Sequence, residues 1–124
     1  MKKYEAQAQV VLNKYLRETR YYGYFELKWT DKSYLPFAKI EQVQYEGLPA
    51  MEKEGLVWKF SDMDPRPKPC DCISAPPLPS YVVISFGRCF YFIRIDKIID
   101  MRHDGKVSIT KAESREIAEK IVDY

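Results

Sequence analysis

Two ionisable residues in an aromatic stretch have the type and spacing that catalytic chemistry requires. Glu26 and Lys28 lie within residues 24–29 (YFELKW), whose aromatic and apolar content predicts a β-strand. Side chains at positions i and i+2 of a strand point to the same face, so the carboxylate and the ammonium stand side by side. One interpretation is a cross-strand ion pair on a solvent-facing surface. The other is a metal-dependent nuclease centre, in which the carboxylate holds a divalent cation and the ammonium stabilises phosphate charge or helps to activate water.

Two further polar residues lie beside apolar stripes. Residues 3–19 have helical periodicity, and Glu5 stands in the first turn at the edge of the apolar stripe. The helix macrodipole favours an anion there, or else Glu5 points into a site shared with Glu26. Gln44 falls on the apolar side of a second helix, predicted after Pro36. It is either a hydrogen-bonded core glutamine or a side chain that reaches Glu26 and Lys28.

Composition limits the function classes. The 124 residues have the length of one domain, 1–124, and 46% hydrophobic residues are enough for one core. With 20 basic and 18 acidic residues the net charge is only +2, so nucleic-acid binding would need a local basic patch. Residues 1–30 are the basic part, with six Lys/Arg against three Asp/Glu.

The cysteines and the first residues indicate the compartment. Three cysteines are an odd number, and Cys70, Cys72, Cys89 and His103 do not have zinc-site spacing. No apolar signal core and no membrane-spanning run is present, so we expect a cytoplasmic protein.

The middle of the chain reads as short strands and stiff connectors. The second helix has Ile40, Val43, Gly47, Leu48 and Met51 on its apolar face; Pro49 should kink or shorten it, and Gly55 should stop it. Residues 56–62 predict a strand, 64–69 a proline-rich loop, and 70–73 a short strand.

The last third predicts the centre of the sheet. Residues 80–86 and 89–95 predict a hairpin of buried strands turning at Gly87-Arg88. Residues 96–107 read as a polar connection. Thr110 and Glu113 match a capping box for a last helix, whose apolar side would be Ile117, Ala118, Ile121 and Val122. The predicted order is α-β-α-β-β-β-β-α, an α/β fold in which helices flank a small mixed β-sheet.

Several of these pieces together resemble a known family. Glu26-Leu27-Lys28 after a short helix resembles the E-x-K half of the PD-(D/E)XK nuclease motif, and Leu35-Pro36-Phe37, Gln44 and Gly47-Leu48 resemble the segment that follows it in Holliday junction resolvases. Similarity to small phage-encoded, resolvase-like proteins is carried by residues 59–62, 68–72, 81–84, 107–110 and 116–118. The resemblance covers nearly the whole chain and implies a restriction-endonuclease-like fold.

The resemblance also implies roles for particular residues. Glu26 would be a metal-binding carboxylate, Lys28 the catalytic lysine, Glu5 the glutamate of the first helix, and Gln44 the glutamine that follows the motif. The family's metal-binding Asp on the strand before E-x-K has no counterpart in residues 18–25. Asp71, which follows Pro69 as P-x-D, is our candidate replacement, and Asp62 is the second; both are otherwise ordinary loop aspartates.

The implied activity is hydrolysis of DNA phosphodiester bonds by an endonuclease that depends on Mg²⁺ or Mn²⁺, held by Glu26, Asp71 and Glu5. Contacts to the DNA backbone would come from the basic residues of the first helix and the proline-rich loop: Lys2, Lys3, Lys14, Arg17, Arg20, Arg66 and Lys68. A four-way junction has symmetric arms, so we expect a homodimer, in the host cytoplasm if the protein is phage-encoded. The alternatives are a catalytically inactive nucleic-acid-binding module of the same fold and a small interaction protein.

Overall fold

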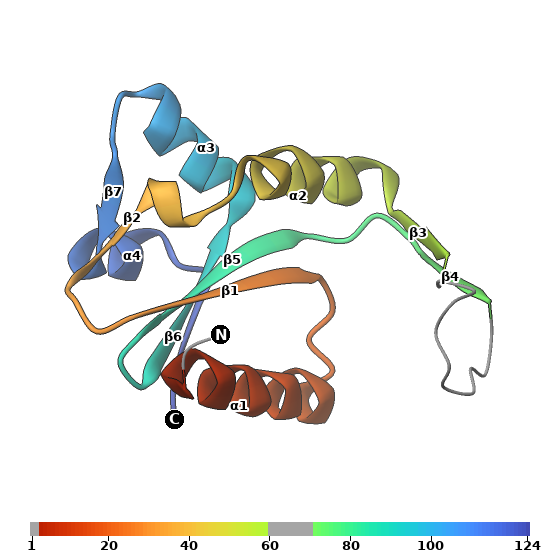
Figure 1. Cartoon of the computed structure of the whole chain (residues 1–124), viewed down its shortest axis with the longest axis horizontal. Coiled ribbons are helices and arrows are strands. Elements are labelled where there is room, and N and C mark those ends of the chain that lie inside the picture. Colours follow the sequence, from red (N-terminus) through yellow and green to blue (C-terminus); the bar gives the residue numbers. More distant parts are fainter. Residues whose placement is uncertain (1–2, 60–70) are drawn as a thin grey trace.

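A four-stranded mixed sheet organises the chain (Figure 1). The computed structural model describes residues 3–59 and 71–124. In chain order they form α1 (Lys3–Thr19), β1 (Tyr24–Thr30), β2 (Tyr34–Pro36), a 3-10 helix η1 (Phe37–Lys39), α2 (Gln42–Glu54), β3 (Leu56–Lys59), β4 (Cys72–Ala75), β5 (Ser80–Phe86), β6 (Cys89–Arg94), α3 (Ile95–His103), β7 (Ser108–Thr110), α4 (Lys111–Ile117) and β8 (Lys120–Asp123). The predicted mixed α/β fold class is confirmed.

The main sheet has the strand order β1-β5-β6-β8. β1 pairs in parallel with β5, and α2 lies in the connection between them, whereas β5, β6 and β8 pair antiparallel. Every residue of β5 is buried, as its nearly continuous apolar sequence predicts. The hairpin turn at Gly87-Arg88 is confirmed, and Gly87 adopts the positive φ of 63° that the turn requires.

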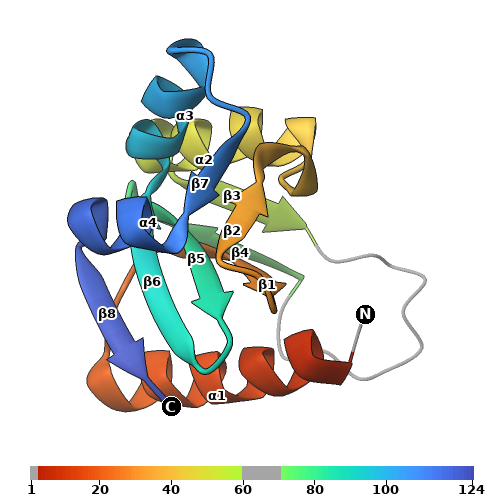
Figure 2. The ribbon, with the colours of Figure 1, turned by 90° about the vertical axis from the view of Figure 1, so that its left-hand side faces the viewer.

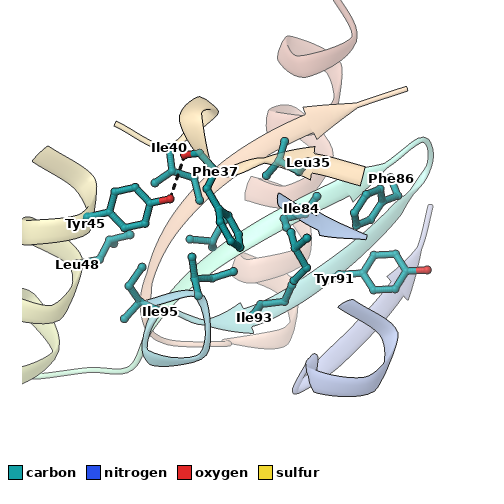
Figure 3. Packing of buried hydrophobic residues seen from close by; sticks show 13 residues of the cluster. Leu35, Phe37, Ile40, Tyr45, Leu48, Ile84, Phe86, Tyr91, Ile93 and Ile95 are labelled. Carbon is teal, nitrogen blue, oxygen red and sulfur yellow. Dashed lines mark hydrogen bonds between the residues drawn. The ribbon is translucent and has the colours of Figure 1, made fainter. Parts of the chain in front are cut away.

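Helices cover the two faces of the sheet (Figure 1). On one face α1 buries Ala8 and Leu12 against Leu27, Val83 and Phe92. On the other face α2, α3 and η1 pack on the sheet. Figure 3 shows this second core, in which Phe37 and Ile40 lie against Leu48, Ile84 and Ile95, and the Tyr45 hydroxyl donates a hydrogen bond of 3.0 Å to the Phe37 carbonyl.

Two pairs of short strands lie outside the main sheet. β2 pairs antiparallel with β7, beside α4 (Figure 2). β3 and β4 pair antiparallel as a ribbon that extends away from the sheet (Figure 1). Within residues 3–59 and 71–124 no helix is long and apolar enough to cross a membrane. Cys72 and Cys89 are free thiols.

The second helix differs from its prediction at its start and at its apolar face. Ile40 precedes α2, and Val43 is exposed, whereas Tyr45 and Leu48 are buried. Pro49 lies inside α2 and does not end it. The adjacent residue Leu48 is buried in the core, and this packing holds the helix in place around the proline. Gly55 ends α2 as predicted, with a φ of 83° and with the Ala75 carbonyl so close that a Cβ would lie 2.4 Å from it.

Two predicted elements near the end of the chain are wrong. Residues 96–107 were expected to form a polar connection, but α3 occupies most of them, because Ile95 and Ile98 recur at helical spacing and are fully buried. The last helix ends at Ile117 rather than continuing, and residues 120–123 pair with β6 as strand β8. Residues 120–123 pair with the edge of β6 that β5 leaves free, and this pairing overrides an apolar pattern that also fits a helix.

The predicted capping box of α4 is confirmed. The Thr110 hydroxyl accepts a hydrogen bond of 3.1 Å from the Glu113 backbone N–H, and the Glu113 carboxylate accepts one of 3.0 Å from the Thr110 N–H. Glu113 also forms an ion pair with Lys106. The hydrogen bond from Lys106, followed by the one from the Thr110 backbone, lowers the pKa of the Glu113 carboxyl below its usual value.

This shift predicts a pH-dependent contribution to stability. Because the folded state lowers the pKa of Glu113, the contribution is complete above the ordinary value of 4.5 and is lost as the pH falls through the lower folded value. Glu113→Gln keeps an acceptor for the Thr110 N–H but loses the charge. We expect it to cost about 0.5 kcal/mol at pH 7 and less at an acidic pH below the lowered pKa, measured by urea unfolding. The exposed Glu116→Gln on the same helix is the control; an equal loss at both pH values would contradict the electrostatic origin.

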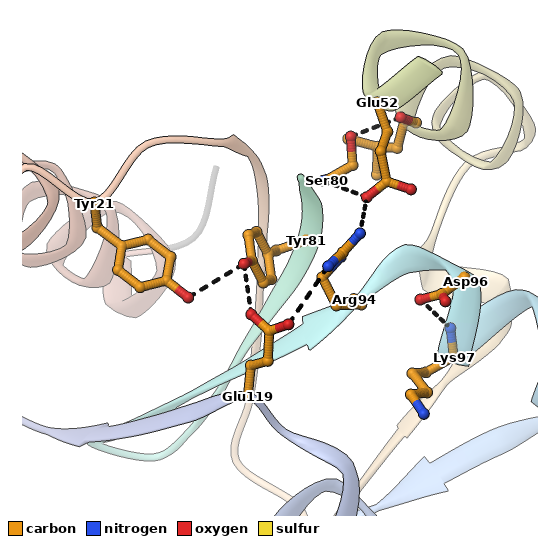
Figure 4. A network of polar contacts seen from close by, with 9 residues as sticks. Tyr21, Glu52, Ser80, Tyr81, Arg94, Asp96, Lys97 and Glu119 are labelled. Atoms are coloured by element: carbon orange, nitrogen blue, oxygen red, sulfur yellow. Dashed lines mark hydrogen bonds and ion pairs between the residues drawn. The ribbon is translucent and has the colours of Figure 1, made fainter. Parts of the chain in front are cut away.

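A polar network ties both helical layers to the strands (Figure 4). The Arg94 guanidinium donates to Glu52 of α2 at 2.5 Å and to Glu119, which precedes β8, at 3.4 Å. The Tyr81 hydroxyl donates to Glu119 at 2.6 Å and accepts from Tyr21 at 3.2 Å. Burial and these hydrogen bonds raise the pKa of Tyr81 far above its usual value, so Tyr81 stays neutral.

Candidate functional site

Glu26 and Lys28 stand side by side on β1, as their spacing predicts. Lys28 Nζ lies 3.4 Å from Glu26 Oε1, and the two side chains retain 15% and 30% of their exposure, respectively. The ion pair is therefore made within one strand, not across strands, and it is largely withdrawn from solvent rather than on an open surface. Pairing of β1 with β5 along its whole length fixes the positions of both residues.

A cavity of about 590 Å³ opens beside Lys28. It lies between the first turn of α1, the carboxyl end of β1, β2 and η1. Its lining consists of Glu5, Lys28, Trp29, Thr30, Asp31, Lys32, Tyr34, Leu35, Pro36 and Lys39. The structure thus brings the predicted residues Glu5 and Lys28 to one cavity, with Glu26 attached to it through its ion pair.

Packing of α1 on the sheet places Glu5 there. The rings of Tyr4 and Trp29 are stacked at 5.2 Å between centroids, which fixes the first turn of α1 at the carboxyl end of β1. Ala8 and Leu12 continue this contact along the helix and are fully buried. Glu5 itself is half-buried. Its position at a helix start and its position on the cavity are therefore compatible.

Sequence reasoning missed three charged residues of the cavity. Asp31 and Lys32 form the turn that directly follows β1, and Lys39 ends η1. Together with Lys28 the two lysines give the cavity three ammonium groups, against the carboxylates of Glu5 and Asp31. The position of Asp31-Lys32 immediately after the strand of Lys28 was a signal for their inclusion, whereas Lys39 depends on the path of the chain through β2.

Gln44 occupies neither of the two positions that the sequence suggested for it. Its Oε1 accepts a hydrogen bond of 3.0 Å from the Glu41 N–H, and the Glu41 side chain accepts from the Gln44 backbone, which makes a capping box at the start of α2. Gln44 is not among the residues that line the cavity. Its side chain neither packs as a core glutamine nor reaches Glu26 and Lys28, because the start of α2 uses its carbonyl.

The predicted third metal ligand is not brought to the other two. Asp71 is exposed and directly precedes β4, whose first residue pairs with Lys59 at the outer end of the β3–β4 ribbon (Figure 1). Asp62 lies outside the described residues. In the described part of the chain no three His, Cys, Asp or Glu side chains are grouped so that they could hold a metal ion. The set Glu26, Asp71 and Glu5 is therefore not assembled there, because antiparallel pairing with β3 holds Asp71 on the ribbon.

Four of the predicted DNA-contacting residues belong to the described part of the chain, and all four lie on or directly after α1. Lys3, Lys14 and Arg17 are exposed on α1, and Arg20 is exposed just after it. Lys14 forms an ion pair with Glu18, with 3.9 Å between Nζ and Oε1. Lys2, Arg66 and Lys68 lie outside the described residues. The described basic residues thus form a tract along the helix that also carries Glu5.

Comparisons with protein-family models, with curated proteins and with solved structures find no match to this chain.

Proposed function

We propose that this protein is a metal-dependent endonuclease that hydrolyses phosphodiester bonds in DNA, related to the Holliday junction resolvases of the PD-(D/E)XK superfamily. The observation that carries the proposal is the partly buried Lys28, held by Glu26 and opening with Glu5 into one cavity. A strand with an E-x-K sequence, followed by a helix and a parallel strand, supports a restriction-endonuclease-like fold.

The charges of the cavity suit a phosphodiester. In hydrolysis, water attacks phosphorus and the bond to one ester oxygen breaks, while negative charge grows on the phosphoryl oxygens. Lys28, oriented by Glu26, stabilises that charge where little bulk water competes. Lys32 and Lys39 neutralise the neighbouring backbone phosphates.

In this proposal a divalent cation binds the site only when the DNA substrate is present, because phosphate oxygens complete its coordination shell. Mg²⁺ binds proteins through one or two carboxylates and completes its shell with waters and phosphate oxygens. Glu26 and Glu5 would supply the carboxylates for Mg²⁺ or Mn²⁺. Such an ion lowers the pKa of bound water and neutralises phosphate charge.

DNA backbone contacts extend along α1 in this proposal. Lys3, Lys14, Arg17 and Arg20 are exposed on or next to one helix, and such contacts give affinity without base specificity. Selectivity would then depend on DNA shape, such as that of a four-way junction, recognised by a homodimer.

A specific observation favours a second candidate, a nucleic-acid-binding module without catalysis. The described residues hold no group of three metal-ligating side chains, and Asp71 stands on the ribbon instead. Such a module would use the same lysines and α1 tract to hold the DNA backbone.

One experiment separates the two candidates. Labelled four-way junction, linear duplex and single-stranded DNA are incubated with the protein and Mg²⁺, Mn²⁺ or chelator, and binding is titrated in parallel from low to high salt. Metal-dependent products establish the nuclease, and the preferred DNA defines its substrate. Salt-sensitive binding without products under any metal establishes the module. Absence of both contradicts each candidate.

A further inference from the structure

β1 is an edge strand with an open side. It pairs with β5 only, and the direction of its backbone groups follows from two hydrogen bonds: Tyr24 N–H donates to Pro79 at 2.9 Å, and Thr30 accepts from Gly87 at 3.2 Å. The backbone N–H and C=O groups of successive residues in a strand point alternately to its two edges. The even-numbered residues of β1 therefore point these groups toward β5. The backbone groups of Phe25, Leu27 and Trp29 therefore point away from the sheet.

These outward groups have no hydrogen-bond partner among residues 3–59 and 71–124. Proteins commonly protect such an edge with a proline, a bulge, a very short strand or a charged side chain, especially a lysine. β1 has seven residues, contains no proline, and pairs with β5 in unbroken register; the charge of its lysine, Lys28, is balanced by the ion pair with Glu26. It is therefore a template on which a further strand can pair.

The charges of β1 select one partner strand and one register. Consider a second β1 laid antiparallel along this edge by a two-fold axis. If Leu27 lies opposite its own copy, the outward residues form the hydrogen-bonded pairs, and Glu26 of each chain lies opposite Lys28 of the other. Moving the centre to Glu26 sets two carboxylates opposite each other, and moving it to Lys28 sets two ammonium groups opposite each other. Like charges at directly opposite positions are destabilising, so of these three registers the one centred on Leu27 is the complementary one.

The opposite face of the strand agrees with this register. Phe25 of one copy lies opposite Trp29 of the other, and cross-strand aromatic pairs stabilise sheets. Both side chains are only half-buried in the single chain. The same register therefore satisfies the backbone, the charged face and the aromatic face.

We propose that the open edge of β1 binds β1 of a second copy of this chain, joining two four-stranded sheets into one. The second copy then adds a carboxylate and an ammonium to the candidate site of the first, which by itself has few acidic ligands. The interface is inferred from the open edge, its charges and its aromatic side chains. Its test does not depend on nuclease activity, so the two proposals can fail separately.

Charge reversal and its rescue test the interface. Light scattering after size-exclusion chromatography should give the wild type twice the mass of the 14.7 kDa chain. Glu26→Lys and Lys28→Glu, studied separately, should each fall twofold in mass to a single chain, because like charges then oppose each other. Their equimolar mixture, and the double variant Glu26→Lys/Lys28→Glu, should regain the doubled mass. A wild type that stays a single chain up to its solubility limit, or a dimer that neither reversal weakens, would overturn the proposal.

Cysteine pairing provides a second measurement if a charge variant fails to fold. In a background with Cys70, Cys72 and Cys89 replaced by alanine, Glu26→Cys and Lys28→Cys are oxidised separately and as a mixture. Directly opposite positions in non-hydrogen-bonded pairs have Cα atoms about 4.5 Å apart, within disulfide range. Positions 26 and 26 are diagonal, at about 7–8 Å. A covalent dimer formed mainly in the mixture supports the register, whereas none, or equal amounts in all three samples, contradicts it.

Discussion

Replacing Lys28 with methionine is expected to lower the rate of DNA cleavage by about 10²–10³-fold, the usual cost of losing one positioned group that stabilises transition-state charge. Methionine keeps most of the length and apolar volume of the lysine stem and removes only the ammonium. Lys28 forms an ion pair with Glu26 and is one of the three lysines that line the cavity. Single-turnover cleavage with saturating enzyme measures the effect on the chemical step rather than on binding.

Three controls interpret that result. Lys97→Met removes an equally charged but exposed residue of α3, away from the cavity, and should leave the rate unchanged. Lys28→Arg retains the charge and should recover part of the rate. DNA affinity of Lys28→Met should fall by far less than its rate, because Lys32, Lys39 and the α1 tract remain. Equal losses in rate and affinity would instead make Lys28 a binding residue and favour the module without catalysis.

Local patterns predicted the elements that carry the candidate site. The strand of Glu26 and Lys28 was readable from its aromatic residues and its period of two, and α1 from its apolar stripe. The side-by-side placement of these two residues followed from spacing alone, because residues i and i+2 of a strand share a face. The capping box of Thr110 and Glu113 was equally local. In each case the interacting residues are at most a few positions apart.

Tertiary packing decided what the sequence did not predict. Ile121 and Val122 have spacing that suits a helix with Ile117, but β6 had an open edge, and pairing with it made them part of β8. α3 was not predicted because its polar residues outnumber its isoleucines, of which Ile95 and Ile98 are buried in the core. The cavity likewise joins α1, β1 and η1, and no local pattern relates Glu5 to Lys39.

Gln44 and Asp71 show the limit of transferring roles along a chain. The glutamine was expected at the site, but three residues before it Glu41 completes a capping box, and that local use of the amide determines its position. Asp71 was assigned from its P-x-D sequence, yet β4 pairs with β3, not with β1. A residue type in a suitable order therefore becomes a site residue only when strand pairing brings it there.

Arg94→Met is expected to lower the free energy of unfolding by about 2–3 kcal/mol, and the melting temperature by roughly 10 °C. Arg94 bridges Glu52 and Glu119, and its guanidinium lies 5.7 Å from the centre of the Tyr81 ring. Its side chain is 30% exposed and that of Glu52 27%, so solvent compensates only partly for the lost partner. The loss therefore combines missing hydrogen bonds with two carboxylates left close together without a cation.

The two carboxylates make that origin testable. In the triple variant Glu52→Gln/Arg94→Met/Glu119→Gln no unpaired charge remains, so about half of the lost stability should return. Arg94→Lys should be intermediate, because one ammonium cannot reproduce the fork that joins both carboxylates. Arg17→Met, at an exposed position of α1, should change stability by less than about 0.5 kcal/mol. Chemical unfolding of all four variants at pH 7 measures these differences. If the triple variant were no more stable than Arg94→Met, the loss would come from packing of the arginine stem, and the network would hold the layers together by volume rather than by charge.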